Sequence, residues 1–144
     1  MMKRNLWLAA GMLGIMALAA CQNKKAPATS YEQPPPAKGL KTVYYDFDKS
    51  NVRDDQVTTL ENNAGVMKSS SGSATIEGHC DERGTNEYNL ALGDRRARSS
   101  KNFLINLGID PNRMTTISYG EERPVCNEHD ESCWWQNRRA YFAK

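Results

Sequence analysis

The sequence has little net charge and no apolar run long enough to cross a membrane. Its 144 residues include 19 lysines and arginines against 17 aspartates and glutamates, a formal charge of +2. A chain so close to neutral has no basic field to attract nucleic acid, so we expect no nucleic-acid partner. The longest apolar run, LWLAAGMLGIMALAA, has 15 residues, whereas a spanning helix needs about 20.

Recognisable catalytic and cofactor motifs are also missing. The chain contains no glycine-rich nucleotide loop and no pair of carboxylates with a clear division into acid and base. It has two histidines, and no Ser-His-Asp arrangement can be argued from the sequence. We therefore expect no enzyme activity and no cofactor.

The first 20 residues have the pattern of a bacterial secretory signal peptide. A positive start, MMKRN, precedes the apolar run, which ends in Leu18–Cys21. This ending resembles a lipobox, in which the cysteine is acylated and the chain is cut before it. Two or three acyl chains anchor a protein stably. We expect Cys21 to be lipidated. In the lipoproteins that the segment resembles, an aspartate after this cysteine favours the inner membrane. Gln22 follows Cys21 here, so we expect an anchor in the outer membrane, with the protein facing the periplasm. The alternatives are an ordinary signal peptide or a short membrane helix.

A polar, proline-containing segment follows the expected anchor. Residues 21–41 are rich in Lys, Ala, Ser, Thr, Gln and Pro, including the triplet Pro34–Pro36. Such a composition buries too little apolar surface to offset the entropy of ordering. We interpret the segment as a tether, although a proline-rich stretch can also dock a partner. Residues 42–144 are then long enough for one domain with its own core.

This domain is predicted to alternate strands with helices. β-branched and aromatic runs predict strands at 42–47, 74–79, 114–119 and 139–142. Apolar residues three and four apart predict two helices, with faces formed by Val57, Leu60, Ala64 and Met67 and by Ala97, Ser100, Leu104 and Leu107. Gly108 is well placed to end the second helix. We expect an α/β two-layer sandwich, a small mixed sheet covered on one face by helices.

Four stretches of the domain resemble motifs of a known family. IEGHCDERGTNEYNLALGDRRA, residues 76–97, closely resembles the signature of the OmpA-like peptidoglycan-binding domains. YYDFDKSNV, from residue 44, resembles their first-strand motif, and ISYGEERPV and NRRAYF resemble their closing motifs. The four motifs occur in the expected order and cover essentially the whole domain. Within the family, the likeness is greatest to the peptidoglycan-associated lipoproteins.

The resemblance implies binding of the peptide stem of peptidoglycan at its diaminopimelate residue. That residue ends in a carbon with both an ammonium and a carboxylate, so a receptor needs an acid and a cation, best an arginine. Matched to the motif, Asp81 would receive the ammonium, and Arg96, expected in the first turn of its helix, the carboxylate. Asp46 and Asn89 would add hydrogen bonds. A plain salt bridge between Asp81 and Arg96 is the alternative.

Other charged residues surround this expected site. Arg95 competes with Arg96, but consecutive helix residues point about 100° apart, so only one can face Asp81. We assign Arg95 a solvated or salt-bridged role. Asp48, Glu82 and Arg83 could line the rim of the site or be solvated.

The resemblance also implies a cellular role and partners. It predicts an outer-membrane lipoprotein that tethers the membrane to the wall within the Tol–Pal system. TolB is then a partner, and the role is in envelope integrity and cell division. The alternatives are another OmpA-like envelope lipoprotein outside that system and a peptidoglycan hydrolase.

Three cysteines remain besides Cys21. In an oxidising periplasm we expect Cys126 and Cys133 to form a disulfide across the loop VCNEHDESC. Zinc binding by these two cysteines and His129 is an alternative, although no fourth ligand is evident, and we expect no metal. Cys80 stands where the family motif has threonine. We interpret it as a buried thiol, the alternatives being a nucleophile or a bond to another chain.

Overall fold

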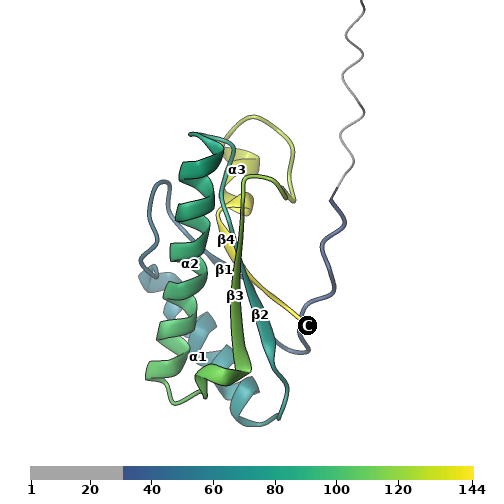
Figure 1. The fold of residues 1–144 in the computed structure, drawn as a ribbon. Helices are drawn as coiled ribbons and strands as arrows, with labels where there is room; N and C mark the ends of the chain where they lie inside the picture. The colour runs from purple at the N-terminus through teal and green to yellow at the C-terminus, as the bar shows by residue number, and fades with distance from the viewer. Residues whose placement is uncertain (1–30) are drawn as a thin grey trace, which may run out of the picture.

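The structure is a computed structural model, and it describes residues 31–144 (Figure 1). The expected signal peptide, Cys21 and most of the tether lie outside these residues. The elements in chain order are β1 (Val43–Tyr44), α1 (Asp54–Lys68), β2 (Ala74–His79), α2 (Asn86–Asn106), the 3-10 turn η1 (Pro111–Arg113), β3 (Met114–Gly120), α3 (Glu131–Asn137) and β4 (Arg139–Ala143). Within residues 31–144, no helix is both long and apolar enough to span a membrane.

The four strands form one mixed sheet in the order β1-β4-β2-β3. β4 runs antiparallel to both of its neighbours, and β2 runs parallel to β3. Figure 1 shows α1 and α2 on one side of the sheet, and α3 at the end where α2 begins. The prediction of a small mixed sheet in an α/β fold is confirmed.

The core lies between the sheet and the two long helices. Alternate strand residues point toward the helices, so Ile76 and Phe142 pack with Leu60 of α1 and Leu104 of α2. The other face of the sheet has buried polar groups, among them Glu77, His79 and Arg139.

Packed structure begins before the expected boundary at residue 42. Pro36 forms a β-bridge with Ala143, and the Ala37 amide donates to the Phe142 carbonyl at 2.8 Å. Ala37 and Leu40 belong to the core cluster. The last residues assigned to the tether therefore belong to the domain.

The predicted strands and helices differ from the observed ones in three places. β1 is shorter than the expected strand at 42–47, since the chain turns away after Tyr45. α2 starts at Asn86, capped by the Thr85 hydroxyl, so Arg96 lies in the middle of the helix and not in its first turn. α3 was not predicted.

Candidate ligand-binding site

A pocket opens where β2 ends and α2 begins. It has a volume of about 280 Å³ and a mixed lining of charged, polar and apolar side chains. The lining residues are Phe47, Asp48, Cys80, Asp81, Arg83, Gly84, Tyr88, Asn89, Leu92 and Arg96. Three of the four residues predicted to bind the ligand, namely Asp81, Asn89 and Arg96, are therefore brought together.

Asp81 lies buried at one side of the pocket between two guanidinium groups. Arg83 donates to both of its carboxylate oxygens, from Nε at 3.1 Å and from Nη2 at 2.6 Å. Arg138, itself buried, donates from Nη1 at 3.1 Å. Burial acts to raise the pKa of Asp81, but the hydrogen bonds from Arg83 and Arg138 hold it below its usual value. Asp81 is thus an ionised acid that two arginines fix in place.

Arg96 forms the floor of the pocket and is 1% exposed. Its guanidinium donates to three backbone carbonyls, those of His79 at 2.8 Å, Lys49 at 2.8 Å and Asp46 at 2.9 Å. Within residues 31–144, no carboxylate oxygen lies within 4.0 Å of it, so the alternative of a direct salt bridge to Asp81 is not formed. Burial lowers the pKa of Arg96 because the charge loses its water. Asp81 is the acid whose charge acts on Arg96 from a distance, and a buried cation without a direct ion pair favours an anionic ligand.

Asn89 organises the turn after β2. It is buried, and its side-chain amide donates to the carbonyls of Asp81 and Arg83 at 3.2 Å each. The same amide contacts Glu121, which follows β3. Asn89 therefore holds together the segments that form the pocket wall.

Asp46 is not brought to the pocket, whereas Asp48 is. The Asp46 side chain is 54% exposed and lies 3.5 Å from Arg53 Nη1, and only its backbone carbonyl contacts Arg96. Asp48 lines the pocket, where the Tyr88 hydroxyl donates to its carboxylate. Its φ of 56° is left-handed, a conformation that aspartate tolerates better than most residues.

A salt-bridge network extends behind Asp81. Arg138 pairs with Glu131 of α3 as well as with Asp81, and Glu131 lies 3.6 Å from Arg83 Nη2. Burial acts to lower the pKa of Arg138, but these two carboxylates raise it above its usual value. Sequence reasoning missed Arg138, although it belongs to the closing motif NRRAYF.

Comparison with known proteins assigns the chain to a family. The model of the OmpA family matches residues 44–137. The chain belongs to the OmpA family.

Two relatives from this family carry the same descriptive name. The chain is 40% identical over 144 residues to the peptidoglycan-associated lipoprotein of Mesorhizobium japonicum, covering 90% of this chain and 86% of that protein. It is 50% identical over 99 residues to the peptidoglycan-associated lipoprotein of Rhizobium meliloti, covering 68% of this chain and 56% of that protein.

Solved structures share the fold. The crystal structure of the peptidoglycan-associated lipoprotein from Burkholderia pseudomallei matches with a TM-score of 0.69 at 43% identity, over 72% of this chain and 88% of that one. The C-terminal domain of Helicobacter pylori MotB matches with a TM-score of 0.66 at 19% identity, over 74% and 86%, which shows the fold alone.

In this OmpA domain the unusual cysteine, Cys80, is a buried thiol. Its Sγ donates to the Asn89 carbonyl at 3.3 Å and accepts from Arg96 Nη1 at 3.3 Å. Burial raises the pKa of Cys80 to about 11. The neighbouring His79 pairs with Glu77, 3.4 Å away. A neutral thiol of this kind is a poor nucleophile.

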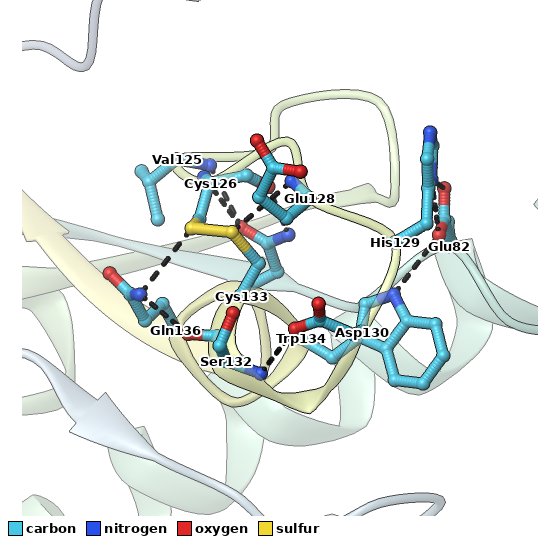
Figure 2. The surroundings of a disulfide bond; sticks show 11 residues. Glu82, Val125, Cys126, Glu128, His129, Asp130, Ser132, Cys133, Trp134 and Gln136 are labelled. Carbon is cyan, nitrogen blue, oxygen red and sulfur yellow. Dashed lines mark hydrogen bonds and ion pairs between the residues drawn. A yellow bond between two sulfur atoms is a disulfide. The ribbon is translucent and has the colours of Figure 1, made fainter.

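The loop between β3 and α3 is closed by a disulfide between Cys126 and Cys133, with their Cα atoms 5.0 Å apart (Figure 2). Both sulfurs needed for the zinc alternative are therefore in a covalent bond, and His129 pairs with Glu82 instead. Across residues 31–144, no group of three or more His, Cys, Asp or Glu side chains could hold a metal ion.

Proposed function

We propose that this protein is a non-enzymatic envelope lipoprotein whose OmpA domain binds peptidoglycan without covalent bonds. Family membership and the likeness to peptidoglycan-associated lipoproteins support this role. The observation that carries the proposal is the pocket with Arg96 at its floor, a buried cation that forms no direct ion pair with residues 31–144. The proposed ligand group is the end of diaminopimelate that carries both charges.

The charges that line the pocket suit a zwitterion. Two carboxylates, Asp48 and Asp81, stand against two guanidinium groups, Arg83 and Arg96. A guanidinium has five N–H groups, and four of those on Arg96 donate to the protein. The fifth is left for the ligand carboxylate.

The ligand ammonium needs an acid that is not already neutralised. Asp81 has two arginine partners, whereas Asp48 has the hydroxyl of Tyr88. We therefore propose that the ammonium binds between Asp48 and Asp81, closer to Asp48, beside the apolar wall formed by Phe47 and Leu92.

Anchoring and protein partners extend the proposal to the cell. Acylation of Cys21 would hold the protein in the outer membrane, so that wall binding tethers the membrane to peptidoglycan. Replacement of Cys21 by serine should release the protein from the membrane fraction. Co-purification with TolB would support membership of the Tol–Pal system, whereas its absence would favour an OmpA-like lipoprotein outside that system.

The central test is calorimetry of the purified protein against a stem tripeptide that contains diaminopimelate. The lysine-containing tripeptide is the control, since it lacks the second carboxylate and should bind at least tenfold more weakly. Asp48→Asn should weaken binding about tenfold, because a charge-assisted hydrogen bond is lost. Asp46→Asn changes the same loop outside the pocket and should leave the affinity unchanged. Equal binding of both tripeptides would contradict the proposal.

A further inference from the structure

Arg83 is held in the pocket by two aromatic rings as well as by Asp81. Its guanidinium lies 3.8 Å from the ring centre of Phe47 and 4.2 Å from that of Trp134. From this geometry we infer that Trp134 is a positioning residue for the binding site. It acts through Arg83 on the carboxylate of Asp81, and the disulfide loop holds it there. The inference rests on the proposed function.

The contacts of Arg83 form a clamp, which we define as Phe47, Arg83 and Trp134. Phe47 lies in the loop after β1 and Trp134 on α3, so the clamp joins segments far apart in sequence. Phe47 is 52% exposed, and the stacked guanidinium covers part of its ring. Between the two rings, Arg83 donates to both oxygens of Asp81. The rings thus fix the plane in which Arg83 meets the carboxylate.

Without the rings, Arg83 would be held in one rotamer only by its carboxylate partners, the buried Asp81 and the exposed Glu131. The Arg83 side chain is 30% exposed, and a long exposed side chain loses considerable entropy when it is ordered. Stacking by Phe47 and Trp134 supplies that order before the ligand arrives. A carboxylate that is already oriented binds its ligand more tightly than one that must be ordered on binding.

Trp134 is itself held by two independent contacts. Its Nε1 donates to Glu82 at 3.0 Å, and Glu82 also contacts His129 (Figure 2). The preceding residue, Cys133, is buried and bonded to Cys126. α3 has only seven residues, too few for a stable helix without such restraints. The disulfide therefore supports the ring that positions Arg83.

The side chain of Asn137 adds a second restraint on the same loop. Its Oδ1 accepts from the amides of Val125 and Cys126 at 2.9 and 3.2 Å, and its Nδ2 donates to the Cys126 carbonyl at 2.8 Å. Because these bonds do not involve the sulfur atoms, we expect a reduced protein to stay folded with a looser clamp.

Three variants test the role of Trp134 in the affinity for the diaminopimelate tripeptide. Trp134→Leu should weaken binding about threefold to tenfold, the loss expected for a cation–π contact at a partly exposed site. Trp134→Phe keeps a ring over Arg83 and should retain most of the affinity. Trp135→Leu is the matched control, because that ring packs against Tyr44 in a tilted arrangement, with ring centres 5.2 Å apart, and not against Arg83. Equal affinities for Trp134→Leu and Trp135→Leu would overturn the inference.

A second measurement needs neither ligand nor variant. In NMR spectra of the oxidised protein, the Nε–H of Arg83 should exchange slowly and be shifted by the rings, compared with that of Arg98, whose side chain is 67% exposed. Reduction of the disulfide should move the Arg83 signal toward that of Arg98. Matching signals in the oxidised protein would overturn the clamp. Failure of the tripeptide to bind while the Arg83 signal is protected would instead reject the proposed function.

Discussion

Gly78 of β2 and Gly93 of α2 approach so closely that a Cβ on Gly78 would lie 1.8 Å from the Gly93 carbonyl oxygen. A Cβ on Gly93 would lie 2.3 Å from Ser118 Oγ. The absence of side chains at both positions lets the helix press against the sheet one turn before Arg96. This contact places Arg96 below the end of β2, where its Nη1 reaches the His79 carbonyl at 2.8 Å.

Gly78→Ala should therefore lower the free energy of unfolding by about 3 kcal/mol, because backbone atoms must move to admit the methyl group. Thermal denaturation measures the change. Gly65→Ala is the matched control, since nothing lies within 4 Å of its added Cβ. Gly65 lies in the last turn of α1, where alanine should raise stability by up to about 1 kcal/mol. Equal melting temperatures for the two variants would show that the glycine contact does not constrain the fold.

Arg96→Lys should destabilise the protein by about 2–4 kcal/mol. Lysine cannot reproduce the planar set of donors, so carbonyls such as those of His79 and Lys49 would lose their partner in a buried site. Urea denaturation measures the loss. Arg95→Lys changes the exposed neighbour and should stay within about 0.5 kcal/mol of the parent protein. If both variants are equally stable, Arg96 does not have the structural role assigned to it.

The strands and the family motif could be predicted because their signals are local. β2 was predicted at 74–79 and runs over the same residues, and its adjacent β-branched residues Thr75 and Ile76 point to opposite faces of the sheet. The beginning of α2 was missed for a different reason. The first turns of α2, NEYNLALGD, contribute to the pocket wall. Their apolar residues therefore do not recur at the spacing of three and four that marks one buried helix face.

The partners of Asp81 could not be predicted from the sequence. The family motif indicates an acid, Asp81, and an arginine, Arg96. It does not indicate that the acid contacts two other arginines instead. Arg83 is two residues away, whereas Arg138 arrives from the other end of the domain, and the choice depends on how α3 packs. The sequence of α3, ESCWWQN, has no apolar residues at helical spacing that would predict a helix. The disulfide and the Glu131–Arg138 ion pair hold this helix in place instead.

Removing the disulfide with Cys126→Ser and Cys133→Ser should lower the free energy of unfolding by about 2–3 kcal/mol. The bond closes a short loop, and its loss raises the entropy of the unfolded chain. Chemical denaturation with and without reductant gives the difference. The double variant should not respond to reductant, and a reductant effect on it as large as on the parent protein would contradict this account.

Cys80 should resist alkylation in the folded protein. With a pKa of about 11, only about one thiol in a thousand is ionised at pH 8, and the sulfur is also buried. Mass spectrometry after iodoacetamide treatment should find the peptide with Cys80 unmodified, and fully modified once guanidinium chloride is added. Rapid labelling of Cys80 under native conditions would rule out the buried site.

The free energy of unfolding should fall in acid because of His79. This residue lies on the face of the sheet that points away from α1 and α2. Burial lowers the pKa of His79 from 6.5 to about 4, although Glu77 at 3.4 Å acts in the opposite direction. Arg139 and Arg123 also disfavour the charged ring. Between these two pH values the unfolded chain binds a proton that the folded protein does not.

The stabilising effect of a neutral His79 is complete above pH 6.5 and is lost as the pH falls toward 4. The loss over that range is at most about 3 kcal/mol. His79→Gln removes this titration while leaving the acidic groups in place, so its unfolding free energy should fall less steeply with acidification. Urea denaturation of both proteins at pH values from 7 to 4 measures the difference. Parallel curves would show that the folded protein accepts the proton on His79 as readily as the unfolded chain, and that burial does not control this histidine.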